Sequence, residues 1–126
     1  MKDQVLSIKQ MQHLKELRVD TSEASMCYVV DAFRNYELEV YDVFSPEIHH
    51  LHPIPAFTLQ DMLEMMPNRV KGFDLVLFMD NHIQYEKWDG IRQAKILVQF
   101  DGKNLLETTY NMLCWLAENK LLGKEE

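Results

Sequence analysis

The chain carries one cluster of side chains that could bind a metal ion. Glu47, His49, His50 and His52 form an E-x-H-H-x-H pattern in a stretch bounded by prolines. Imidazole nitrogens bind zinc and nickel, and a bent loop can bring three of them together. The spacing matches neither an H-E-x-x-H helix nor a paired-cysteine finger. A metal-binding or small hydrolytic protein that uses these residues is one hypothesis, and polar loop residues without a physiological metal are the alternative.

Other patterns with catalytic chemistry carry little information. Because the chain has 20 Asp and Glu residues, same-face pairs such as Glu37 and Glu39 arise readily, and they suit a solvated strand as well as acid–base catalysis. The sequence has no G-x-S-x-G motif, no P-loop and no G-x-G-x-x-G motif. The sequence therefore gives no positive support for an enzyme, and we expect no catalytic residues and no cofactor.

The composition predicts one globular domain over residues 1–126. Hydrophobic residues make up 47% of the chain and charged residues 26%, which is the balance of an ordinary domain of this length. The net charge of -7 argues against binding to phosphates, which needs clustered Lys and Arg. We expect no direct nucleic-acid binding, although an acidic surface could instead mimic DNA and inhibit a nucleic-acid-binding protein.

The sequence also predicts where the protein resides. No apolar run has the length of a signal peptide core or of a membrane span, so we expect a cytoplasmic protein that does not bind membranes. Cys27 and Cys114 each lie in apolar surroundings, which favours reduced core thiols over a disulfide.

The first half of the chain predicts a helix followed by a β-hairpin. Ser7 and Gln10 have the spacing of a capping box, which starts a helix from Ile8 to about Arg18. Residues 26–33 and 36–44 are rich in β-branched and aromatic side chains and predict two paired strands. The prolines of residues 45–56 predict a loop without regular structure.

The second half predicts two helices around three strands. Thr58 and Asp61 form a further capping box, and Pro67 ends the helix that it starts. Asn104 caps a last helix. Between these helices we expect antiparallel strands at residues 73–80, 83–88 and 94–100.

The order of these elements, α-ββ-α-βββ-α, indicates the fold class. It lacks the strict alternation of strand and helix that a parallel α/β sheet requires. We therefore predict an α+β fold in which an antiparallel sheet of about five strands is covered on one face by three helices.

The last helix also points to an interaction surface. One face should be buried against the sheet, and it consists of Leu106, Thr109, Tyr110, Leu113, Leu116 and Ala117. Trp115 falls on the polar side, where it is covered by another segment of the chain or anchors a partner. Met65, on a methionine-rich helix, and Trp88, on a strand near a turn, are further candidate interaction residues.

Three helical signatures span most of the chain. They are Ser7, Gln10, Leu14 and Leu17, the run Thr58 to Leu63 between Pro55 and Pro67, and the L-x-x-x-Y-x-M-L-x-W-L pattern of residues 106–116. In this layout the chain resembles a group of small uncharacterised proteins common in gut Bacteroidales genomes and their prophages or mobile elements. Because that group has no assigned activity, the resemblance implies a compact cytoplasmic α+β domain and transfers no site residues.

These features together favour a non-enzymatic protein–protein interaction module. The protein would act as a homodimer, or as an adaptor or accessory protein of phage or mobile-element type. The metal-binding protein and the DNA mimic described above are the alternatives.

Overall fold

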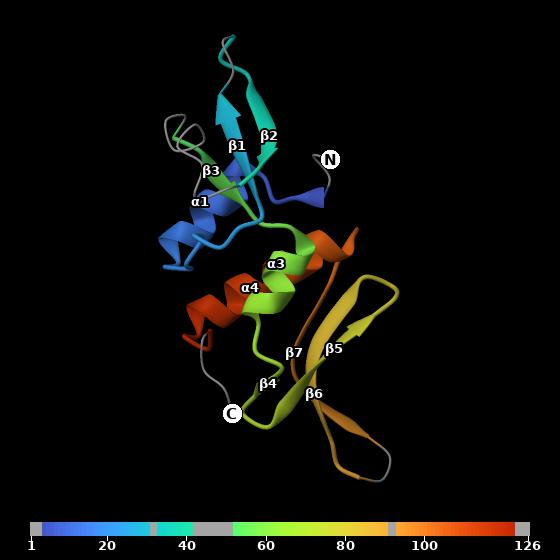
Figure 1. Ribbon diagram of the computed structural model, residues 1–126. Coiled ribbons are helices and arrows are strands. Elements are labelled where there is room, and N and C mark those ends of the chain that lie inside the picture. The colour runs from blue at the N-terminus through green and yellow to red at the C-terminus, as the bar shows by residue number, and fades with distance from the viewer. Residues whose placement is uncertain (1–3, 31–32, 42–51, 91–92, 123–126) are drawn as a thin grey trace. The chain divides into compact units, whose positions relative to one another are not determined.

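The computed structural model describes residues 4–30, 33–41, 52–90 and 93–122 of the chain (Figure 1). These residues form three helices and seven strands, and the strands lie in two antiparallel sheets of three and four strands. The predicted α+β class is therefore confirmed. The chain divides into two compact units, Met1–Asp61 and Met62–Glu126. A single domain over residues 1–126 stays a prediction.

The first unit begins with helix α1 (Ile8–Glu16), which starts at the predicted capping box. The hydroxyl of Ser7 accepts a hydrogen bond from the Gln10 amide at 3.1 Å, and the Gln10 side chain accepts one from the Ser7 amide at 2.9 Å. These bonds satisfy two amides that the helix itself cannot pair. The helix ends slightly earlier than predicted because Arg18 adopts a left-handed φ of 67°.

The first unit also contains a three-stranded sheet with the order β2-β1-β3. Strands β1 (Met26–Val30) and β2 (Tyr36–Val40) form the predicted hairpin, with Tyr28 opposite Leu38. Strand β3 (Ile54–Ala56) pairs with the other side of β1. The prediction that this proline-rich stretch has no regular structure is wrong for these three residues.

Hydrogen-bond alternation explains how Pro55 fits in a strand. The Tyr41 amide donates to the Ser25 carbonyl at 2.9 Å, so the backbone groups of Ser25 and Cys27 point toward β2. Pro55 lies opposite Cys27, at a position where no hydrogen bond to β1 is made. Its missing N–H would point to the open side of an edge strand, where proline is tolerated.

Asp61 connects the start of β1 to the start of helix α3 (Leu59–Met65). Its carboxylate accepts hydrogen bonds from the amides of Ser25 and Thr58, both at 2.9 Å, and from the Ser25 hydroxyl. The Thr58 hydroxyl in turn accepts from the Asp61 amide at 3.1 Å, which completes the predicted capping box. Asp61 is only 6% exposed, so both carboxylate oxygens need these partners.

The second unit holds a four-stranded sheet with the order β4-β5-β6-β7 and the last helix. Its elements are β4 (Arg69–Val70), β5 (Phe73–Phe78), β6 (His82–Trp88), β7 (Ala94–Asp101) and α4 (Leu105–Glu118). Helix α4 packs against β6 and β7 (Figure 1). Strands β5 to β7 correspond to the three strands predicted from the sequence.

The prediction of one sheet of about five strands is wrong in its details. The two additional strands, β3 and β4, have three and two residues and lie next to prolines, which hides them from periodicity. Both are edge strands: β3 pairs with the side of β1 that faces away from β2, and β4 pairs with the side of β5 that faces away from β6. The hairpin β1–β2 and the strands β5 to β7 therefore belong to separate sheets.

Helix α4 begins at the predicted cap, where Asn104 accepts a hydrogen bond from the Glu107 amide at 2.8 Å. Thr109, Leu113 and Leu116 of the predicted face are buried, whereas Leu106, Tyr110 and Ala117 are half-buried. Thr108, which lies outside the predicted face, is also buried. Its hydroxyl donates to the Asn104 carbonyl at 2.9 Å, so burial leaves no unpaired donor.

The bonds of Asp61 predict the effect of two substitutions on stability. Asp61→Ala leaves the amides of Ser25 and Thr58 without acceptors, so the free energy of unfolding should fall by about 1–3 kcal/mol. Asp61→Asn keeps one oxygen for both amides and should lose less than about 1 kcal/mol. Urea unfolding measures both values. If both variants lost the same free energy of unfolding, the hydrogen bonds from these two amides to Asp61 would not explain the loss.

The burial of Leu113 predicts a second stability effect. Leu113 is 0% exposed, so Leu113→Ala should lower the free energy of unfolding by about 2–5 kcal/mol through lost burial and a cavity. The matched control is Glu118→Ala on the exposed end of the same helix, which should change stability by less than about 0.5 kcal/mol. A loss below about 1 kcal/mol for Leu113→Ala would contradict its place in the core.

Candidate interaction surface

The predicted metal ligands fall mostly outside the part of the chain that is described. Glu47, His49 and His50 lie in residues 42–51. His52 is described, and it is exposed with a left-handed φ of 47°. Within residues 4–30, 33–41, 52–90 and 93–122, no group of three or more His, Cys, Asp or Glu side chains could hold a metal ion. The metal site stays a prediction.

The three predicted interaction residues differ in exposure. Trp115 is half-buried between the buried Cys114 and Leu116 of α4. Met65 is also half-buried, near the end of α3. Trp88 is 63% exposed at the end of β6. Trp88 is therefore the one of the three that presents most of its surface to solvent.

The strand that carries Trp88 has two different faces. Ile83 and Tyr85 are 0% exposed, and the Tyr85 hydroxyl donates to the Pro67 carbonyl at 2.7 Å. These apolar positions match the buried side of α4, which packs on this strand. Because side chains alternate along a strand, the residues between them point to the opposite face. We call that opposite surface the open face, and it includes Phe78, His82, Gln84, Glu86, Trp88 and Ile96.

A row of hydrogen-bonded side chains runs along β6 on the open face. Glu86 accepts from the Gln84 side-chain amide at 2.7 Å and from the Trp88 indole N–H. Since the Gln84 nitrogen donates to Glu86, its oxygen faces His82 Nε2, which lies 2.7 Å away. That ring nitrogen must then carry the proton. His82 Nδ1 lies 3.9 Å from an Asp101 carboxylate oxygen.

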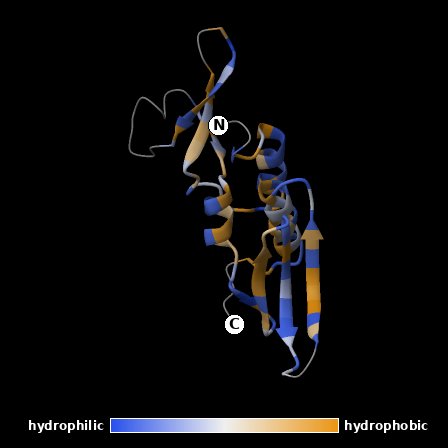
Figure 2. Ribbon diagram, turned by 90° about the vertical axis from the view of Figure 1, so that its right-hand side faces the viewer, coloured by the Kyte–Doolittle hydropathy of each residue, from blue (hydrophilic) through white to orange (hydrophobic). Residues whose placement is uncertain are grey.

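Apolar side chains of the neighbouring strands flank this polar row. Val76 lies opposite Gln84 and Phe78 opposite His82, so these pairs share the open face. The Phe78 and His82 rings meet edge to face with centroids 5.4 Å apart. Figure 2 shows β6 as a hydrophilic strand between the more hydrophobic β5 and β7.

A β-bulge places Ile96 on the same face. The register shifts between Tyr85 and Glu86, so Ile96 rather than Leu97 lies opposite Glu86. Ile96 is 46% exposed, and its diagonal neighbour on β6 is Trp88. Without the extra residue in β7, the alternation would turn Ile96 to the other face.

Exposure varies along the open face in a way that limits its chemistry. Gln84 and Glu86, in the middle, are each 7% exposed, whereas Phe78 at one end is 40% exposed. Both oxygens of Glu86 already accept hydrogen bonds, which gives the carboxylate a structural role. The arrangement therefore suits the binding of an apolar surface better than proton transfer.

The sequence alone predicted only part of the open face. The prediction named Trp88 but none of the other members of the open face. The alternation of His82, Gln84, Glu86 and Trp88 with apolar or charged residues is visible in the sequence HIQYEKW. The contribution of Ile96 is not visible, because it depends on the bulge.

Five titratable groups have raised pKa values, and each is buried or half-buried: Cys27, Tyr28, Tyr85, Tyr110 and Cys114. Burial is the main cause that raises the pKa of the Cys114 thiol above 9.0, and the hydrogen bond with Tyr110 partly offsets it. Burial and the nearby Glu39 carboxylate raise the pKa of Cys27. Burial also raises the pKa of Tyr85 and, as its main cause, that of Tyr110. Both cysteines are free and buried, as expected for core thiols.

These shifts predict how stability depends on pH. The unfolded chain loses the protons of these five groups at a lower pH than the folded protein does. Their contribution to the free energy of unfolding is thus complete below about pH 9 and is lost as the pH rises through the raised pKa values. Urea unfolding between about pH 8 and pH 11 measures this loss.

A matched variant tests the assignment to these groups. Cys114→Ala removes one of these groups, so its free energy of unfolding should fall less steeply with pH than that of the wild type. A wild-type stability that stays constant over this pH range would contradict the raised pKa values of these groups.

No helix in the described part of the chain is both long and apolar enough to cross a membrane.

Comparison with known proteins adds no family to this description. No protein-family model, curated protein or solved structure matches the chain.

Proposed function

We propose that the protein is a non-enzymatic protein–protein interaction module, and that the open face of the four-stranded sheet is its binding surface. It acts as a homodimer, or as an adaptor or accessory protein of the phage or mobile-element type that the sequence resemblance implies. The observation that carries the proposal is Trp88, whose side chain is 63% exposed while its indole N–H is held by Glu86.

The hydrogen bond to Glu86 supports this role because it prepares Trp88 for binding. An exposed tryptophan normally loses rotational freedom and must satisfy its N–H when a partner covers it. Here the indole N–H is already paired within the chain. A partner that covers Trp88 therefore gains its apolar area at a low cost in entropy and desolvation.

The surroundings of Trp88 extend the apolar area. Ile96 and Phe78 are 46% and 40% exposed on the same face, and Met79, in the turn after β5, is 104% exposed. The polar row between these residues is paired internally. A partner can therefore cover the middle of the open face without leaving a buried polar group unpaired.

Self-association through the open face can be tested with Trp88 itself. The chain has two tryptophans, so in Trp115→Phe the fluorescence comes from Trp88 alone. For a homodimer, this emission should shift to shorter wavelength as the protein concentration rises, because the partner removes water from the indole. Light scattering on the same samples should show the mass double.

Two alanine variants identify the surface. Trp88→Ala should stay monomeric where the wild type dimerises, whereas Phe33→Ala removes an 84% exposed aromatic from the first unit and should dimerise normally. A wild type that stays monomeric at millimolar concentration contradicts the homodimer form. A dimer that persists in Trp88→Ala contradicts the open face as its interface.

A further inference from the structure

Strand β2 is an edge of its sheet within the described part of the chain. The hydrogen bond from the Tyr41 amide to the Ser25 carbonyl fixes the alternation, so the backbone groups of Glu37 and Glu39 point toward β1. Those of Leu38 and Val40 point away from β1. Outward backbone groups on an edge strand are the groups that pair with an added strand.

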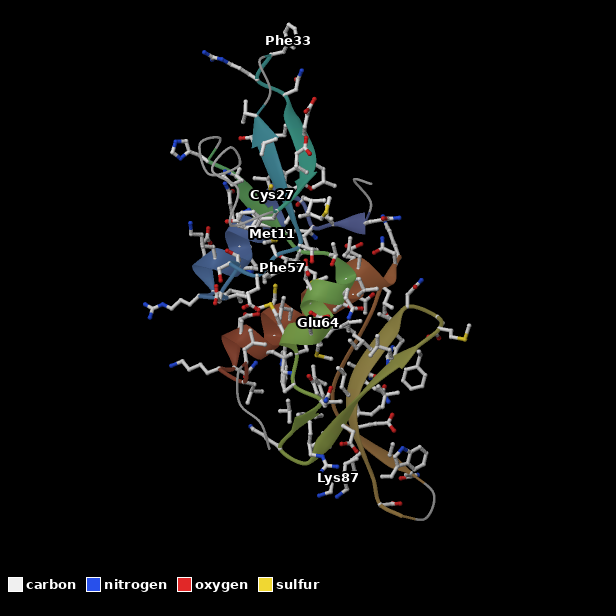
Figure 3. All side chains as sticks on the ribbon, in the orientation of Figure 1. Met11, Cys27, Phe33, Phe57, Glu64 and Lys87 are labelled. Atoms are coloured by element: carbon white, nitrogen blue, oxygen red, sulfur yellow. The ribbon has the colours of Figure 1, made fainter. Side chains whose placement is uncertain are left out.

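One face of this edge is apolar, and its two ends are open to solvent, whereas Leu38 between them packs against the core residues Val5, Tyr28 and Ala56. Tyr36, Val40 and, on β1, Val30 share this face and are 49%, 68% and 42% exposed. Among the described residues, strand β3 pairs with Met26 to Tyr28, so the part of the hairpin that they show beyond Tyr28 is two-stranded. Figure 3 shows Phe33 at the end of the hairpin, far from Cys27.

The other face of the edge carries two carboxylates. Glu37 and Glu39 are exposed, and their cross-strand neighbours on β1, Val29 and Cys27, are uncharged. The ion pairs Arg69–Asp74 and His82–Asp101 lie elsewhere, in the second unit. A strand added beside β2 that places Lys or Arg at alternate positions would pair with both carboxylates.

The same two carboxylates disfavour pairing of β2 with the β2 strand of a second copy of the chain. Two antiparallel copies related by a two-fold axis share their faces, so even-numbered residues meet even-numbered ones and odd meet odd. A register centred on Leu38 places Glu37 against Glu39, and neighbouring registers place Glu37 or Glu39 against itself. Like charges that face each other across strands are destabilising.

We propose that the edge of β2 binds an extended basic segment of another protein, which adds antiparallel to the sheet as a fourth strand. Its backbone pairs with Leu38 and Val40. Its cations lie against Glu37 and Glu39, and its apolar side chains lie against the face that carries Tyr36. This surface belongs to the first unit, so the proposal does not rest on the open face or on its self-association.

The probe is an eight-residue peptide in which lysine alternates with valine, and the matched control carries glutamate in place of lysine. Fluorescence anisotropy of the labelled peptides measures affinity, and amide chemical shifts of Leu38 and Val40 locate the binding. The lysine peptide should bind, with lower affinity at higher salt, and the glutamate peptide should not.

Two sets of variants separate the charges from the backbone edge. Glu37→Gln combined with Glu39→Gln should weaken binding of the lysine peptide about two- to thirty-fold, since each pair contributes modestly. Val40→Pro removes an outward N–H without touching the bonds to β1, so it should bind about two- to twelve-fold more weakly than Val40→Ala.

Trp88→Ala is the control for the other surface and should bind the lysine peptide as the wild type does.

Equal affinity for the lysine and glutamate peptides, or no binding of either at millimolar concentration, would overturn the proposal. So would Val40→Pro binding as tightly as Val40→Ala. Loss of peptide binding in Trp88→Ala would move the site to the open face. A monomeric wild type that binds the lysine peptide would separate the two proposals, because only self-association would then have failed.

Discussion

A central antiparallel strand forms hydrogen bonds with two neighbouring strands, because the backbone groups of alternate residues point to opposite sides of it. The backbone groups of Ser25, just before β1, and of Cys27 point to β2, and those of Met26 and Tyr28 point to β3. This division places Pro55 where it needs no donor and leaves Leu38 and Val40 facing outward. Strand β6 holds the same position in the second unit, and its side chains divide as well, with Tyr85 in the core and Trp88 on the open face.

Sequence patterns predicted the features that depend on neighbouring residues. The helix starts at Ser7, Thr58 and Asn104 are local, because a cap involves side chains within one helical turn, and the structure has all three. The hairpin β1–β2 and the strands β5 to β7 also follow from periodicity.

Features that depend on distant residues were not predictable in this way. The pairing of β3 with β1 brings residues near Pro55 to residues near Cys27, and nothing local marks a three-residue strand. The division into two sheets also depends on which distant segments pair. The open face could not be predicted in full for the same reason, because Ile96 belongs to it only through a β-bulge in the pairing of β7 with β6. Trp88 could be named because an exposed aromatic near a turn is a local signal.

The two proposed surfaces differ in their physical basis. The open face relies on apolar area and on a polar row that is paired before binding, so its affinity should depend little on salt. The edge of β2 relies on backbone groups and on two exposed carboxylates, so charge decides which segments it accepts.

Pro55 has a consequence for assembly. It sits in the middle of β3 with no N–H to offer on the outer side, so the three-stranded sheet cannot be extended well past β3. Among the described residues, strand addition to this sheet is therefore favoured at β2. A folded unit with one blocked edge cannot pair through both edges of this sheet, so its copies cannot form an open-ended series through these edges, which lowers the risk of edge-to-edge aggregation.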